Sequence, residues 1–114
     1  MTINAIKELL DAQVLFGEEL LDLEAEFVFS SDMMSDVLAY AQDQSVLVTG
    51  LCNPQVVRTA EMLDIVCIVF VRGKSPDEHI LRLAREKGIV ILATEHHMFT
   101  TCGILYVNGL RGGA

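Results

Sequence analysis

Gly73, Lys74 and Ser75 follow an apolar stretch of strand length, at the place where a phosphate-binding P-loop would end. A complete P-loop has another glycine five residues before Gly73, but that position is Ile68, which lies inside the apolar stretch. No loop is therefore available whose amides could surround a phosphate. We interpret the tripeptide as a turn between a strand and a helix, which disfavours a kinase or nucleotidase of the Walker type.

Glu95, His96 and His97 have side chains that could bind a metal or transfer protons. Adjacent side chains on a helix project about 100° apart, so His96 and His97 cannot face one ion unless the turn is irregular. The remaining histidine, His79, lies near the start of another predicted helix, and the chain has no HxxxH or CxxC spacing. We predict neither a metal site nor a cofactor.

Cys52 directly precedes a predicted helix start at Asn53, and a helix N-terminus can lower the pKa of a thiol. No base is identifiable beside Cys52 in the sequence, so we assign no catalytic residue. A small enzyme that uses Cys52 or His97 on an anionic substrate remains the alternative. Cys67 and Cys102 lie in apolar stretches, as is typical of reduced core thiols.

The elements that must position these residues begin with three apolar runs, at residues 46–49, 65–71 and 89–92. Continuous runs of this length are typical of strands that are covered on both faces. Helical stretches separate them, and this alternation implies right-handed crossovers and a parallel sheet. We expect an α/β fold: a single three-layer domain with a mainly parallel sheet and a βαβαβα core.

Capping signals locate the helices of this core. Asn53 and Ser75 each directly precede a proline, a pattern in which a capping side chain is followed by the first helical position. Gly88 ends the second of these helices, and a last helix begins after Thr94 and stops at Gly109. One face of the last helix carries Met98, Cys102, Leu105 and Tyr106.

The N-terminal part predicts a helix over residues 3–12, with Thr2 as its N-cap. Two short extended pieces, residues 14–16 and 26–29, are expected with this helix at the edge of the sheet. The polar cluster at residues 30–32 suits the start of another helix. The apolar face of that helix consists of Met34, Val37, Leu38 and Ala41.

The composition excludes several classes of function. The chain has 114 residues, of which 52% are hydrophobic, enough for one domain with a sizeable core. Sixteen acidic against eight basic residues give a net charge of -8, which disfavours nucleic acid as a partner. No apolar run approaches the roughly 20 residues that span a bilayer, and no targeting signal is evident. We expect a cytoplasmic protein without membrane contact, with a domain over residues 1–110 and a flexible tail over 111–114.

Three predicted strand-to-helix loops would meet at one edge of the sheet, because the carboxyl ends of parallel strands share the edge where ligands generally bind. Each loop leads into a helix N-terminus with unpaired amides, and Arg72 with Lys74 adds positive charge. An anionic ligand suits this rim, although capping residues in ordinary turns explain the same pattern. The candidate ligand-binding residues are Thr49, Gly50, Asn53, Arg72, Gly73, Lys74, Ser75, Thr94 and His97.

Three segments carry a family resemblance: FSSDMMSDVLA at residues 29–39, VLVTG at 46–50 and IVFVRGKSP at 68–76. They resemble the DRTGG domain family, and the likeness extends from about residue 3 to residue 110. Val71, Arg72 and Gly73 stand where that family has Thr-Gly-Gly, so only the last glycine is shared.

Members of the DRTGG family occur as standalone proteins, between CBS domains of inorganic pyrophosphatases and in phosphate acetyltransferases. A similar fold forms the non-catalytic N-terminal domain of HPr kinase/phosphorylase. The resemblance implies a regulatory or interaction domain more than an enzyme.

Taken with the loop rim, these features predict a non-catalytic regulatory or interaction domain that senses a small anionic ligand such as a nucleotide. We also expect a homodimer, with another protein as a further partner. A small chain this rich in hydrophobic residues keeps apolar surface, and two-fold dimers are the commonest way to bury it. The apolar residues expected on the surface are Met33, Phe99, Leu105 and Tyr106. Because the last predicted helix carries three of them, it is the helix that we expect at the dimer contact.

Overall fold

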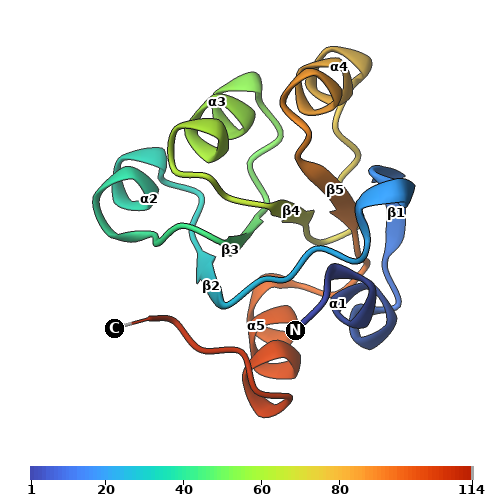
Figure 1. Cartoon of the computed structure of the whole chain (residues 1–114), viewed down its shortest axis with the longest axis vertical. Coiled ribbons are helices and arrows are strands. Elements are labelled where there is room, and N and C mark those ends of the chain that lie inside the picture. The colour runs from blue at the N-terminus through green and yellow to red at the C-terminus, as the bar shows by residue number, and fades with distance from the viewer. Residues whose placement is uncertain (114) are drawn as a thin grey trace.

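A five-stranded sheet forms the centre of the protein in the computed structural model, which describes residues 1–113 (Figure 1). The strand order is β1-β5-β4-β3-β2. The strands are β1 (Gln13–Phe16), β2 (Phe27–Ser30), β3 (Ser45–Thr49), β4 (Cys67–Phe70) and β5 (Val90–Ala93). Strands β2, β3, β4 and β5 pair in parallel, whereas β1 runs antiparallel to β5. The predicted α/β fold with a mainly parallel sheet is confirmed, and the two short N-terminal strands form its two edges.

Helices cover both faces of the sheet. The helical elements are α1 (Ile3–Leu10), the 3-10 turn η1 (Glu18–Leu20), α2 (Met34–Tyr40), α3 (Pro54–Met62), α4 (Glu78–Lys87) and α5 (Met98–Val107). Helices α2, α3 and α4 lie on one face of the sheet, and α1 and α5 lie on the other (Figure 1). The expected three layers are therefore present.

Burial on both faces explains the continuous apolar runs. In β3, Val46 and Val48 belong to the core beneath α1 and α5, whereas Leu47 belongs to the core beneath α2, α3 and α4. This alternation follows from the pleat, which turns successive side chains to opposite faces. Phe70, at the end of β4, is the largest fully buried side chain.

Of the four expected N-terminal caps, two are confirmed and two are wrong. Thr2 accepts a hydrogen bond from the Ala5 amide at 3.1 Å, and Asn53 caps α3. Helix α4, however, begins at Glu78 and is capped by Asp77, not by Ser75. Residues 72–73 form a tight turn that delays the helix, and aspartate caps as well as serine does. At α2 the residue at the cap position is Met33, whose side chain makes no capping bond.

The segment after α5 runs beside the edge strand β2. The Val28 amide donates to the Arg111 carbonyl at 2.9 Å, and Gln42 Nε2 donates to the Gly113 carbonyl at 2.6 Å. Ala114 lies outside the described residues, so the expected flexibility of the last four residues stays a prediction. Among residues 1–113, no helix is both long and apolar enough to cross a membrane.

Candidate functional site

The loop between β4 and α4 forms a tight turn with unusual backbone geometry. Arg72 and Gly73 both have positive φ angles, 60° and 66°, and the Lys74 amide donates to the Val71 carbonyl at 3.2 Å. Positive φ at both central residues is the pattern of a type I′ turn, which glycine adopts freely and arginine only at a cost. The surrounding structure must therefore hold Arg72 in place.

Contacts with the β5–α5 loop hold this turn. The Arg72 amide donates to the His96 carbonyl, and the Gly73 amide donates to the Thr94 carbonyl, both at 2.9 Å. A side-chain carbon at Gly73 would lie 2.5 Å from Oε2 of Glu95, so a larger residue there would displace that exposed carboxylate. The two loops are consequently one unit at the carboxyl edge of the sheet.

Asp32 joins the β2–α2 loop to the β3–α3 loop. Its carboxylate accepts hydrogen bonds from Thr49 Oγ1 at 2.9 Å and from the Gly50 amide at 2.7 Å. This role does not follow from the sequence, because the cluster at residues 30–32 equally suits a helix cap. The only sequence signal was a polar residue directly after a strand, which a helix cap explains equally well.

The structure brings all nine predicted site residues to the carboxyl edge, but several already have partners. The Thr94 hydroxyl donates to the Leu10 carbonyl at 2.9 Å and is almost fully buried. Thr49 and Gly50 bind Asp32, and Asn53 accepts from the Gln55 amide at 2.7 Å. These residues shape the rim. The predicted residues with exposed side chains are Arg72, Lys74, Ser75 and His97, together with Asn53.

The Arg72–Gly73 turn divides this edge into two hollows. The first, which we name the Arg72 hollow, has a volume of about 330 Å³. Its lining residues are Asp32, Gly50, Val71, Arg72, His97, Met98 and Phe99. The second, the Glu95 hollow, has a volume of about 200 Å³. Its lining residues are Asp11, Gln13, Gly73, Ser75, Ala93, Thr94 and Glu95. Of the predicted site residues, Gly50, Arg72 and His97 thus line the first hollow, and Gly73, Ser75 and Thr94 line the second.

The two hollows differ in charge. Asp11 and Glu95 make the Glu95 hollow acidic, which disfavours an anion there. The Arg72 hollow contains the Arg72 guanidinium, which lies directly against Gly50, and no ion pair to it occurs within residues 1–113. His97 is the cap residue of α5, and its side chain makes no capping bond among the residues described. The first-turn amides of α5 therefore keep their preference for an anion.

Residues 5–106 match the family model of the DRTGG domain. The chain belongs to the DRTGG domain family. The resemblance noted from the sequence is confirmed over nearly the whole chain.

A solved structure has the same fold. It contains the CBS and DRTGG domains of the regulatory region of Clostridium perfringens pyrophosphatase, complexed with the activator diadenosine tetraphosphate. It is similar to this DRTGG domain with a TM-score of 0.74 and 18% sequence identity, over 98% of this chain and 48% of that chain. The chain therefore spans about half the length of that structure. A search of curated protein sequences found no match.

Cys52 does not have the environment of an activated nucleophile. Burial raises the pKa of the Cys52 thiol above its ordinary value; Lys74 and Arg72 lower it, whereas Asp77 and Asp32 raise it. The alternative in which the helix N-terminus makes this thiol nucleophilic is therefore not supported. Within the described residues no hydrogen bond joins Cys52 to a base, and no three potential ligands gather around a metal position.

Thiol alkylation tests this interpretation. We expect iodoacetamide at pH 8 to leave Cys67 unmodified in the folded domain, because Cys67 is fully buried and burial raises its pKa. Cys52 should react more slowly in the folded domain than in urea, since a raised pKa leaves less thiolate at pH 8. Mass spectrometry of the peptides measures both rates. Faster alkylation of Cys52 in the folded domain than in urea would instead support Cys52 as a nucleophile.

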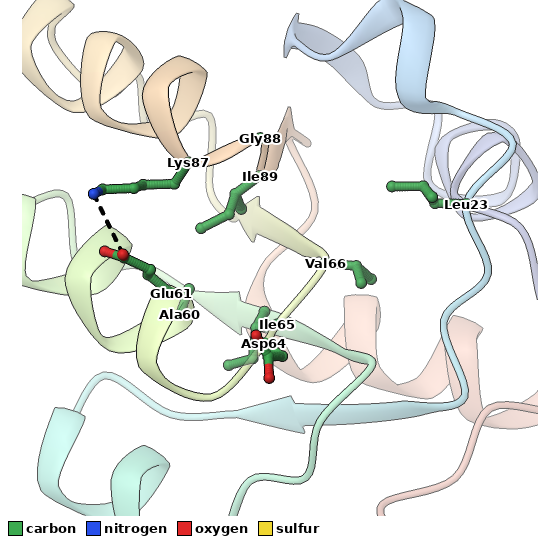
Figure 2. A pocket seen from close by; sticks show the side chains of 9 residues that line it. All are labelled: Leu23, Ala60, Glu61, Asp64, Ile65, Val66, Lys87, Gly88 and Ile89. Carbon is green, nitrogen blue, oxygen red and sulfur yellow. Dashed lines mark ion pairs between the residues drawn. The ribbon is translucent and has the colours of Figure 1, made fainter.

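A third hollow lies at the opposite edge of the sheet, near the amino ends of β4 and β5 (Figure 2). Its volume is about 240 Å³, and Lys87 Nζ lies 3.3 Å from Oε1 of Glu61 across it. Asp64 adds a second carboxylate. Because its lysine is already paired with a carboxylate, this hollow offers an anion no free positive charge.

Proposed function

We propose that this DRTGG domain is a non-catalytic regulatory domain that binds a small anionic ligand, such as the phosphate group of a nucleotide, in the Arg72 hollow. The observation that carries this proposal is the meeting of an exposed guanidinium with the uncapped first turn of α5 at one hollow. Both features favour negative charge, and guanidinium binds phosphate through two parallel hydrogen bonds.

The carboxylate of Asp32 also lines this hollow, and its charge opposes an anion. Two donors, Thr49 Oγ1 and the Gly50 amide, already bind one of its oxygens and stabilise its charge. Lys74 belongs to the same turn as Arg72 and adds positive charge on an otherwise acidic protein. We therefore place the ligand near Arg72 and give Lys74 a weaker, long-range role.

Two further observations support a regulatory role over an enzymatic one. The raised pKa of Cys52 and the absence of a base bonded to it, within the part of the chain described, argue against the enzyme alternative. The similar pyrophosphatase structure comes from a regulatory region that was crystallised with a nucleotide activator. A ligand-sensing function accounts for both.

Calorimetry with pyrophosphate tests the anion site. We expect binding that Arg72→Gln weakens by at least about tenfold, because a charge-assisted hydrogen bond is lost. Raising the salt concentration should weaken binding by the wild-type domain, since the contact is largely electrostatic. The matched control is Arg58→Gln, which removes an exposed arginine from α3.

Two results would contradict the proposal. One is the absence of heat with phosphate, pyrophosphate and ATP up to millimolar concentrations. The other is equal affinity of Arg72→Gln and wild type.

We also propose that the domain forms a two-fold dimer. Of the expected surface residues, Leu105 is fully buried, because α5 turns it toward the sheet. Exposed apolar side chains gather instead on α2, with Leu38 and Tyr40, and on α5, with Phe99 and Tyr106. Since α5 borders the Arg72 hollow, we assign the dimer contact to α2.

Light scattering at tens of micromolar tests the dimer. We expect twice the mass of one chain for the wild type and a shift toward one chain for Tyr40→Glu, because a buried charge opposes association. Tyr106→Glu should leave the mass unchanged. A wild-type mass of one chain would refute the dimer, and a shift caused only by Tyr106→Glu would move the contact to α5.

A further inference from the structure

An apolar groove adjoins the Arg72 hollow, and Phe99 lines both. We name it the α5 groove; it has a volume of about 460 Å³ and runs along α5 beside strand β2, with Val28, Phe99, Gly103 and Tyr106 among its lining residues. Charged and apolar hollows that share one wall can hold the two ends of a single ligand. The ligand then needs a negative group at one end and an apolar body at the other.

Helix α5 presents unusual side chains to this groove. It carries no charged residue from Met98 to Val107, although the chain as a whole is strongly acidic. Phe99 is 90% exposed and Tyr106 is 58% exposed. Large apolar side chains gathered on a surface in this way mark a binding site more often than scattered ones do.

Gly103 leaves an open space between these two rings. It follows Phe99 by four residues and precedes Tyr106 by three, so the three residues share one face of the helix. A side-chain carbon at Gly103 would meet no atom within 4 Å. Glycine destabilises the interior of a helix relative to alanine, so nothing in the folding of α5 itself favours glycine here.

Arg111 supports one wall of this space. Its guanidinium carbon lies 4.3 Å from the centre of the Tyr106 ring, and its Nη1 donates to the Tyr106 carbonyl at 2.7 Å. These contacts hold Tyr106 in a defined position. A flat ring can therefore lie over Gly103 against one aromatic wall, Tyr106, that is already in place.

We propose that one nucleotide occupies both hollows, with its phosphate in the Arg72 hollow and its base in the α5 groove over Gly103, beside Phe99 and Tyr106. This inference rests on the proposed anion site and specifies the rest of its ligand. Every nucleotide base has a flat face that can stack on an aromatic side chain. Phe99 and Tyr106 of α5 supply such side chains. A second copy of α5 would cover the groove but carries no acidic side chain to fill the Arg72 hollow.

A series of three ligands with the same anion tests the inference by calorimetry. Inorganic phosphate has no apolar body, n-hexyl phosphate has a flexible alkyl chain, and adenosine 5′-monophosphate has a base. We expect adenosine 5′-monophosphate to bind at least about tenfold more tightly than phosphate, which is the range of one base stacked on an aromatic ring. Hexyl phosphate should resemble phosphate.

Two variants examine the groove without disturbing the core. Tyr106→Ala should reduce the ratio of nucleotide affinity to phosphate affinity to near one, whereas Met62→Ala, which removes an exposed apolar side chain from α3, should leave the ratio unchanged. Gly103→Ala should raise the melting temperature, since alanine favours a helix, and should also lower the ratio by filling the space. A more stable protein with weaker nucleotide binding excludes unfolding as the cause.

The outcomes separate this inference from the proposed function. Equal binding of phosphate and adenosine 5′-monophosphate, both dependent on Arg72, would overturn the base site and leave the anion site standing. Tighter binding of hexyl phosphate would overturn it in favour of an alkyl group. A dimer that Tyr106→Glu dissociates, with nucleotide affinity unchanged, would assign the groove to a second copy. Failure of all three ligands to bind would remove the anion site and this inference together.

Discussion

Phe70→Ala is expected to lower the free energy of unfolding by about 3–5 kcal/mol, the usual loss for a buried phenylalanine. Phe70 is fully buried at the end of β4, among the side chains beneath α2, α3 and α4. Its replacement leaves a cavity that close-packed neighbours fill only in part. Urea unfolding, followed by circular dichroism, measures the change.

Phe99→Ala is the matched control for this substitution. Phe99 is 90% exposed, so its loss should change the free energy of unfolding by no more than about 0.5 kcal/mol. The two phenylalanines thus separate folding from ligand binding: Phe70→Ala acts on stability, and Phe99→Ala on affinity for a nucleotide. Equal destabilisation by both substitutions would contradict the assignment of Phe99 to a surface groove.

Gly17→Ala is expected to lower the free energy of unfolding by about 2–4 kcal/mol, because it adds both backbone strain and overpacking. Gly17 is buried between β1 and η1 with a φ angle of 106°, a region that side chains rarely enter. A carbon added there would lie 2.9 Å from Cγ2 of Val90 and 3.2 Å from its Cα. Because Val90 belongs to the central sheet, its backbone cannot move aside easily.

Gly88→Ala separates the two causes. Gly88 also has a positive φ angle, 68°, but an added carbon would meet nothing within 4 Å. Only the backbone strain remains in this variant, so we expect the free energy of unfolding to fall by about 1–2 kcal/mol. A loss at Gly17 no larger than the loss at Gly88, measured by the same urea titrations, would show that β5 does move to accept the extra carbon.

The main features of the fold could be predicted because they depend on local patterns. Continuous apolar runs indicate strands covered on both faces, and the helices between them impose a parallel sheet. The cap at Asn53 follows from a side chain and a proline that are adjacent in the sequence. The rim residues could be predicted to gather because parallel strands place their carboxyl ends at one edge.

The division of the rim into two hollows could not be predicted in this way. It depends on the Arg72–Gly73 turn and on its bonds to the β5–α5 loop, which is more than 20 residues away in the sequence. The role of Asp32 likewise depends on Thr49 at the end of β3 and on Gly50, which follows it. Serine and aspartate can cap helices or bridge loops, and the choice follows from which partners tertiary folding places within reach.

The order of residues along the chain is enough to predict the main helices and strands, the parallel sheet and the edge at which the three loops meet. Only the tertiary structure decided that Leu105 is buried while Tyr106 is exposed, and that an apolar groove adjoins the Arg72 hollow. The physical reason is that periodicity reports which side chains along one element share a face. Which neighbours cover that face, and how completely, depends on the packing of segments that are distant in the chain.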